Sequence, residues 1–212
     1  MKLPDCLTAP ELESEAAGLL RAYYGPRLDG GRPFDGRYFD TWRPGPPDTF
    51  TAEDILSMAF LGVTINRRAF LTILAPSPDN RFNALLAKVP DRVDFWDAGA
   101  PAASSAQWQL YDMLRGLSGI GPTKASKLLA RKRRHLIPIR DSVVARVLDL
   151  RKPFWAPLYG ASQEIDLRAR LAAIKARARA EGVALPDNLA LLRVFDVVVW
   201  MSGITGETSF PG

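Results

Sequence analysis

Apolar and charged positions follow a helical period from residue 10 to residue 24, and Gly25-Pro26 interrupts the pattern. This periodicity predicts a first helix that ends before the glycine. The same spacing recurs in three later segments, each bounded by Pro, Gly or Asp, and predicts helices at about 66–75, 79–88 and 103–117. The first half of the chain is therefore expected to be largely helical.

Two other patterns precede residue 66. Residues 25–50 are rich in Gly, Pro and Asp but also contain five aromatic residues, which favours an ordered loop packed onto a core over a flexible linker. Thr51-Ala-Glu-Asp54 has the spacing of a capping box, with Asp in place of the usual Glu. It predicts the start of a helix over the strongly apolar segment that continues to Ile65.

The last third of the chain predicts three more helices. Residues 142–150 suit a short helix, and residues 162–181 suit a longer one with arginines and a lysine on its polar side. A nearly all-apolar run from Leu189 to Met201 predicts a buried final helix, although Val197 to Val199 would also suit a strand. The length of 212 residues suffices for one substantial core, so we expect a single domain, an all-α helical bundle.

Composition excludes several classes of protein. No apolar run approaches the roughly eighteen residues that span a bilayer, and the acidic stretch 11–15 stands where a signal peptide would have its apolar core. The single cysteine, Cys6, and the single histidine, His135, cannot build a zinc site or hold an iron–sulfur cluster. No compact acidic cluster suits magnesium. We therefore expect a cytoplasmic monomer with no metal, no cofactor and no membrane contact.

The net charge of +5 is distributed unevenly. Residues 124–152 contain ten Lys and Arg against two Asp, a net charge of +8, so the remainder of the chain carries −3. Positive charge confined to about thirty residues is typical of a surface that binds a polyanion. A solvated basic surface without a partner would show the same pattern, and charge alone leaves both readings open.

The basic stretch begins in an informative motif. A helical pattern ends at Gly116, residues 117–121 read Leu-Ser-Gly-Ile-Gly, and a second helix is predicted to start with Pro122 at its first position. The two glycines would let another molecule approach the backbone, and the N–H groups of the second helix would suit a phosphate. Three cations are expected on one face of this helix, opposite the apolar residues that pack on the first helix: Lys124, Lys127 and Arg131.

This motif resembles the helix-hairpin-helix element of DNA repair proteins, in which a Gly-aliphatic-Gly turn precedes a basic helix. The resemblance implies a DNA-binding protein that contacts mainly the phosphate backbone, through Gly119, Gly121, Thr123, Lys124, Lys127 and Arg131. A helix C-cap followed by an ordinary turn is the alternative interpretation. The stretch from Gly119 to Val144 also resembles an actinobacterial family of unknown function, which implies no activity.

The resemblance extends to the endonuclease III-like glycosylases, where a catalytic aspartate opens a segment similar to Asp141-Ser-Val-Val-Ala-Arg-Val147. Asp141 lies eighteen residues after Thr123, the spacing of those enzymes. Leu56 to Asn66 also aligns with a helix of the family, with Ala59 where relatives carry a Gln that fills the gap left by the flipped base. The resemblance implies a DNA glycosylase that flips out and excises a damaged, mispaired or modified base, in DNA repair or phage defence.

Some residues depart from the glycosylase pattern, and others also suit a structural role. Thr123 replaces the lysine nucleophile of bifunctional relatives, which implies a monofunctional enzyme unless a longer hairpin brings Lys124 into that place. Asp141 also suits the N-cap of helix 142–150. In the alternative function, a non-enzymatic DNA-binding module, Asp141 would serve only as this cap. Candidates to stack on a flipped base are Tyr38, Trp42, Trp96, Trp108 and Tyr111, each of which would also suit core packing. His135 is expected beside a phosphate, and Arg146 beside the carboxylate or a phosphate.

Overall fold

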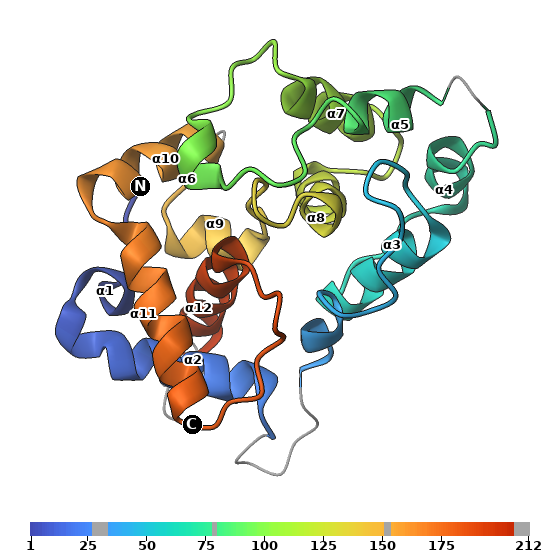
Figure 1. The fold of residues 1–212 in the computed structure, drawn as a ribbon. Coiled ribbons are helices and arrows are strands. Elements are labelled where there is room, and N and C mark those ends of the chain that lie inside the picture. The colour runs from blue at the N-terminus through green and yellow to red at the C-terminus, as the bar shows by residue number, and fades with distance from the viewer. Residues whose placement is uncertain (27–33, 78–79, 151–153, 206–212) are drawn as a thin grey trace. The chain divides into compact units, whose positions relative to one another are not determined.

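A computed structural model describes residues 1–26, 34–77, 80–150 and 154–205. Over these residues every regular element is a helix, as the all-α expectation requires (Figure 1). The chain forms two compact units: unit 1 comprises Met1–Phe34 with Arg140–Gly212, and unit 2 comprises Asp35–Ile139. We expected one domain. That the two units unfold together as one domain stays a prediction.

Unit 1 is built from both ends of the chain. Its elements are α1 (Asp5–Thr8), η1 (Pro10–Leu12), α2 (Glu13–Tyr24), α9 (Ser142–Val147), α10 (Trp155–Glu164), α11 (Leu167–Ala180) and α12 (Leu191–Thr205). Helix α12 packs against α2, α9 and α11, and α2 also packs against α11. The helices predicted at 10–24, 142–150 and 162–181 are confirmed as α2, α9 and α11, although residues 10–12 form η1 and residues 162–164 belong to α10.

Helix α12 is the centre of unit 1. Val197, Val198 and Val199 are fully buried in it, so the expected buried final helix is confirmed and the strand alternative is wrong. The same helix buries an ion pair between Arg193 and Asp196. Arg193 also donates a hydrogen bond of 2.7 Å to the hydroxyl of Tyr23 on α2. Charges inside the apolar core are thus satisfied by partners from the same unit.

Unit 2 is a continuous piece of chain. Its elements are η2 (Asp35–Tyr38), α3 (Ala52–Ser57), η3 (Met58–Leu61), α4 (Arg67–Ile73), α5 (Arg81–Leu86), α6 (Phe95–Ala98), α7 (Ala106–Arg115) and α8 (Pro122–Lys132). Helix α7 packs against α5 and α8, while α3 and η3 pack against α8 and against each other. The helices predicted at 66–75, 79–88 and 103–117 are confirmed as α4, α5 and α7.

Local sequence signals explain how α3 begins and where the apolar segment after it turns. The predicted capping box is present: the Thr51 hydroxyl accepts from the N–H of Asp54, and the Asp54 carboxylate accepts from the N–H of Thr51 over 2.9 Å. The helix expected to reach Ile65 instead becomes the 3-10 helix η3. That helix ends at Gly62, whose φ of 70° favours glycine.

The aromatic residues of the loop before α3 pack as expected only in part. Phe39 and Phe50 are buried in unit 2, whereas Tyr38 is 40% exposed. Trp42 is half-buried beside Phe60. Residues 27–33, part of the expected ordered loop, lie outside the described residues.

Candidate functional site

The segment between α7 and α8 forms a tight turn in unit 2. Helix α7 ends at Arg115, and within the turn the N–H of Ile120 donates to the carbonyl of Leu117 over 3.0 Å. Helix α8 then starts with Pro122, where a proline sacrifices no helical hydrogen bond. Two helices joined at the predicted residues are therefore confirmed. That this turn is a helix-hairpin-helix motif stays a prediction.

Gly119 is required by the fold of this turn. Its φ is +79°, a left-handed conformation that side chains rarely adopt. A Cβ atom on Gly119 would also collide with the side-chain amide of Asn66. That amide donates a hydrogen bond of 2.5 Å to the carbonyl of Ser118. The glycine thus lets a side chain from the start of α4 reach the turn.

Gly121 is not required in the same way. It is exposed, its φ is −90°, and a Cβ atom there would meet nothing within 4 Å. This φ is open to any residue, so the backbone conformation does not demand glycine here. The absence of a side chain at Gly121 has no local structural cause, but it leaves the backbone accessible to an approaching molecule.

The start of α8 combines backbone donors with one cation. Among the residues that the structure describes, no side chain caps this helix, so the N–H groups of its first turn have no side-chain acceptor there. Thr123 and Lys124 are half-buried there, and the Lys124 ammonium donates to the carbonyl of Gly119 over 2.8 Å. The positive end of the helix dipole and the ammonium are thus both at the turn.

The other two cations expected at the interface are inside unit 2. Lys127 and Arg131 are each only 4% exposed. The Lys127 ammonium donates to the carbonyl of Leu61 over 3.0 Å. The sequence placed both residues on a DNA-facing surface, and the structure corrects this prediction. Beyond its first turn, α8 is buried beside α3, η3 and the loop before α3, so the cations there bond to the protein itself.

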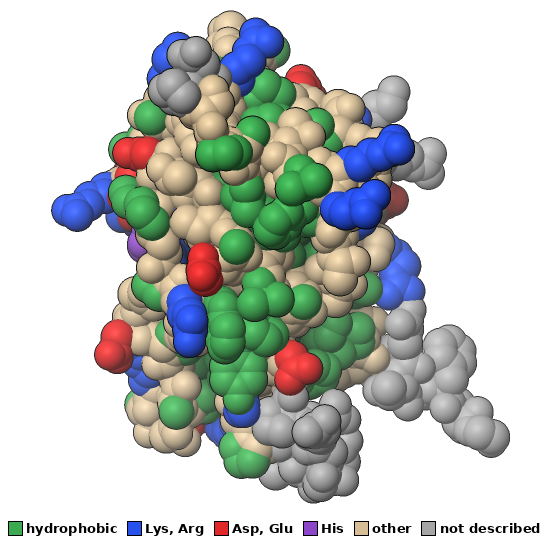
Figure 2. Space-filling model, turned by 90° about the vertical axis from the view of Figure 1, so that its right-hand side faces the viewer, with side chains coloured by type: hydrophobic (Ala, Val, Ile, Leu, Met, Phe, Trp, Pro, Cys, Tyr) green, Lys and Arg blue, Asp and Glu red, His purple; other side chains and the backbone are tan. Residues whose placement is uncertain are grey.

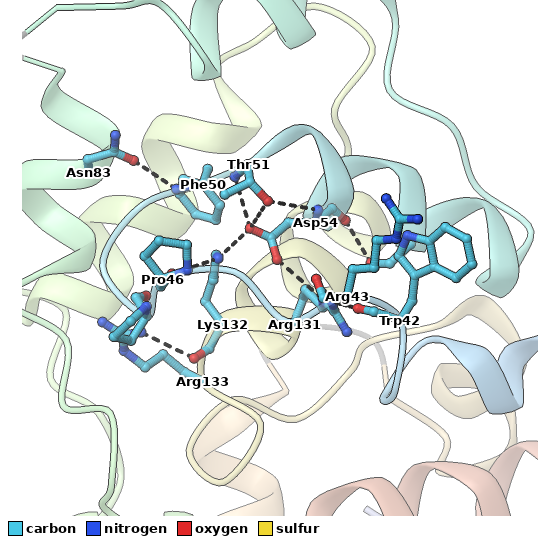
Figure 3. A network of polar contacts seen from close by, with 12 residues as sticks. Trp42, Arg43, Pro46, Phe50, Thr51, Asp54, Asn83, Arg131, Lys132 and Arg133 are labelled. Carbon is cyan, nitrogen blue, oxygen red and sulfur yellow. Dashed lines mark hydrogen bonds and ion pairs between the residues drawn. The ribbon is translucent and has the colours of Figure 1, made fainter.

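Arg131 belongs to a cation cluster at the end of α8 that also contains Lys132 and Arg133 (Figure 3). The buried carboxylate of Asp54 pairs with Arg131 over 3.3 Å and also with the ammonium of Lys132. Burial lowers the pKa of Lys132 and that of Arg131, while the interaction with Asp54 opposes both shifts. One carboxylate thus serves two buried cations and, at the same time, caps α3.

The remaining hydrogen bonds of the cation cluster go to backbone carbonyls. Arg131 donates to those of Phe39 and Trp42, and Lys132 donates to that of Pro46. Arg133, with none of its surface exposed, donates to the carbonyls of Pro47, Leu86 and Val89 and to the carboxylate of Asp48. The cation cluster therefore fastens the loop before α3 onto α8.

These contacts change the interpretation of the basic stretch, residues 124–152. Four of its ten cations, Lys127 and the cation cluster, are buried in unit 2. Arg151 and Lys152 lie outside the described residues. Most of the cations at 124–134 therefore form hydrogen bonds and ion pairs inside unit 2. Neither interpretation drawn from the sequence, a polyanion-binding surface or a solvated basic surface, included this possibility.

Asp141 belongs to unit 1 and opens α9. Its carboxylate accepts a hydrogen bond of 3.0 Å from the N–H of Val143, which confirms the N-cap interpretation. The residue is half-buried, and Arg146 is exposed in the last turn of the same helix. A catalytic role for Asp141 stays a prediction.

The candidate stacking residues fall into separate pairs or clusters within unit 2. Tyr38 and Trp42 both contact Phe60, with ring centroids 5.7 and 5.3 Å apart. Trp108 and Tyr111 form an edge-to-face pair at 5.5 Å, in which Tyr111 is buried. Core packing thus accounts for Tyr111, while Tyr38 presents the most exposed ring of the set.

The remaining two candidates also contact neighbours. Trp96 packs edge-on against Phe95 at 5.3 Å. The ring of His135 lies 3.4 Å from the carboxylate of Asp94. Neither contact indicates a ligand.

Within the described ranges, no three or more His, Cys, Asp or Glu side chains gather as a metal site would require. Among the helices placed there, none combines the length and the apolar character needed to cross a bilayer.

Comparison with known proteins gives one match. No curated protein and no solved structure matches the chain significantly. A family model covers residues 16–203, which includes most of α2, the turn before α8, Asp141 and most of α12. The chain therefore belongs to a family of unknown function, DUF6308.

Proposed function

We propose that the protein binds DNA through residues 118–124, used as a helix-hairpin-helix motif on the phosphate backbone. The observation that carries this proposal is the uncapped start of α8 behind an exposed glycine, Gly121, that the local fold does not require. A phosphate oxygen fits such a place because backbone N–H groups and the helix dipole both favour an anion. The similarity of the turn to DNA repair proteins points in the same direction.

Lys124 supplies the charge at this site. Its ammonium already lies at the turn, hydrogen-bonded to the carbonyl of Gly119. A phosphate bound at the first turn of α8 would gain a charge-assisted hydrogen bond from it. Because Lys127 and Arg131 are buried, the contribution of α8 is one ammonium and not a stripe of three.

The experiment is duplex binding measured by fluorescence anisotropy over a range of salt concentrations. Counterion release makes the logarithm of affinity fall linearly with the logarithm of salt, with a slope of about −0.9 per phosphate contacted. We expect Lys124→Gln to make this slope shallower by about one contact. Affinity that does not change with salt would contradict the proposal.

We propose further that the protein is a monofunctional DNA glycosylase with Asp141 as its catalytic group. In the reaction, water adds to the sugar C1′ as the bond from C1′ to the base nitrogen breaks, and the base leaves with a proton. A carboxylate stabilises the oxocarbenium-like transition state and orients or deprotonates the water. The position of Asp141 at a helix start agrees with the family that the sequence resembles.

Asp141→Asn separates catalysis from capping. Asparagine is an equally good N-cap, so the free energy of unfolding should change little, whereas base release should fall by orders of magnitude. The substrates are duplexes that each carry one damaged, mispaired or modified base, and release is scored as alkali-labile sites. If the wild-type protein binds these duplexes but releases no base from any, the second candidate function holds: a non-enzymatic DNA-binding module, which the N-cap bond of Asp141 favours.

The absence of a lysine at position 123 gives an independent test of the chemistry. Without an amine nucleophile no Schiff base forms, so borohydride should trap no complex with abasic DNA. Trapping that is lost in Lys124→Ala would show that Lys124 takes the place of the nucleophile and that the enzyme is bifunctional.

A further inference from the structure

Two arginines outside the basic stretch 124–152 lie in the first turn of α4. Arg67 and Arg68 are exposed, and neither guanidinium has an ion-pair partner within the described part of the chain. Cations are unfavourable at this end of a helix because they face the positive end of its dipole, and no acidic residue in the turn compensates. A pair that breaks the local rule in this way indicates a role outside the fold.

The start of α4 is tied to the turn before α8 by one side chain. The side-chain amide oxygen of Asn66 accepts from the N–H of Ala69 over 2.9 Å and so caps α4. The amide nitrogen of the same side chain donates to the carbonyl of Ser118. Gly119 makes room for this contact. The two arginines therefore follow directly after a residue that touches the proposed phosphate site.

We infer that Arg67 and Arg68 form a second phosphate-binding cluster, which grips the DNA backbone beside the phosphate held at the start of α8. This inference rests on the proposed DNA binding and deepens it, because the buried cations of α8 leave that site short of positive charge. Arginine suits the task, since its guanidinium pairs with a phosphate through two hydrogen bonds. Figure 2 shows the side of the molecule on which α4 lies, where Lys and Arg side chains are exposed among apolar ones.

A protein partner is the competing occupant, because Leu71 on the same helix is 61% exposed. The charge of the first turn favours the polyanion. An apolar partner would be insensitive to salt, whereas two phosphate contacts make binding more steeply dependent on it. The salt dependence of binding therefore decides between them.

The test compares Arg67→Gln/Arg68→Gln with Lys88→Gln/Arg92→Gln in binding to a duplex of about 20 base pairs. The control pair removes the same charge from two exposed positions in the segment between α5 and α6. We expect the affinity of the first variant to be about tenfold lower, or more, at 0.1 M salt. The slope of its salt dependence should be shallower by the equivalent of about two phosphate contacts. The control should keep the wild-type slope to within about half a contact.

A third variant, Asn66→Ser, keeps an N-cap for α4 but removes the reach to Ser118. It should weaken binding with both arginines still present. If the wild-type protein binds DNA but the two double variants show the same salt slope, the inference is overturned and the proposed function stays intact. A wild-type protein that does not bind DNA would overturn both.

Discussion

Two glycines in one turn meet different demands, and substitution separates them. Gly119→Ala places a Cβ atom at a φ of +79° and against Asn66, so the free energy of unfolding should fall by about 1–2 kcal/mol or more. Gly121→Val meets no neighbour and should change stability by less than about 0.5 kcal/mol. In DNA binding the order should reverse, because a side chain at Gly121 obstructs the phosphate. Equal DNA affinity of Gly121→Val and wild type would remove Gly121 from the interface.

Cys6 gives a test of packing in unit 1 that is independent of DNA. Burial, with a smaller contribution from Glu15, raises the pKa of this thiol to about 11. At pH 8 only about one thiol in a thousand is then ionised, against about one in ten at the ordinary value. Reaction with a disulfide reagent should be at least about a hundredfold slower in the folded protein than in urea. Comparable rates would show that the thiol is accessible.

The same shift has a consequence for stability. Because the pKa is higher in the folded state, the thiol favours folding fully below about pH 9, and this advantage is lost as the pH rises towards 11. Cys6→Ala removes the titrating group. The variant should therefore show a weaker decline of stability over this interval, measured by urea denaturation at each pH.

At the scale of elements, the pairing of α3 with the cation cluster predicts a strong dependence on Asp54. Asp54→Asn leaves Arg131 and Lys132 buried without their carboxylate, which should cost about 3–5 kcal/mol in urea denaturation. Asp48→Asn is the matched control: Asp48 pairs with Arg133 but is 53% exposed, so the loss should be below about 1 kcal/mol. Similar losses in the two variants would show that Asp54 does not carry this role.

The elements with a clear period could be predicted from the sequence. Helices α2, α4, α5 and α7, the capping box at Thr51 and the start of α8 at Pro122 all follow from local signals. Helices α1 and α6 have four residues each, too few to show a period. Helix α10 escaped prediction because it contains Pro157 and Gly160, which read as helix breakers.

The candidate site was predictable only where it depends on local backbone. The turn and the N-cap role of Asp141 follow from short sequence patterns. The burial of Arg131 and Lys132 does not, because their partners are carbonyls more than 85 residues earlier in the chain. The reach of Asn66 to Ser118 spans 52 residues and is equally invisible to periodicity.

At the scale of the whole molecule, unit 2 should fold alone. Residues 35–139 contain their own buried core and all the hydrogen-bond and ion-pair partners described above for the cation cluster. We expect this fragment to unfold cooperatively in circular dichroism and to bind DNA with the salt slope of the full chain, but to release no base because Asp141 is absent. A fragment without a cooperative transition would favour the single domain that the chain length suggested.

The division of the chain also sets an order of events during synthesis. Unit 2 is complete once residue 139 has left the ribosome, so its long-range bonds are available at once. Helix α2 is made before unit 2 but can pack on α11 and α12 only once residues 167–205 have been synthesised. The bond between Tyr23 and Arg193 joins residues 170 positions apart. Until then the face of α2 that packs on α11 and α12 remains uncovered, so unit 1 can complete its core only after unit 2 has been synthesised.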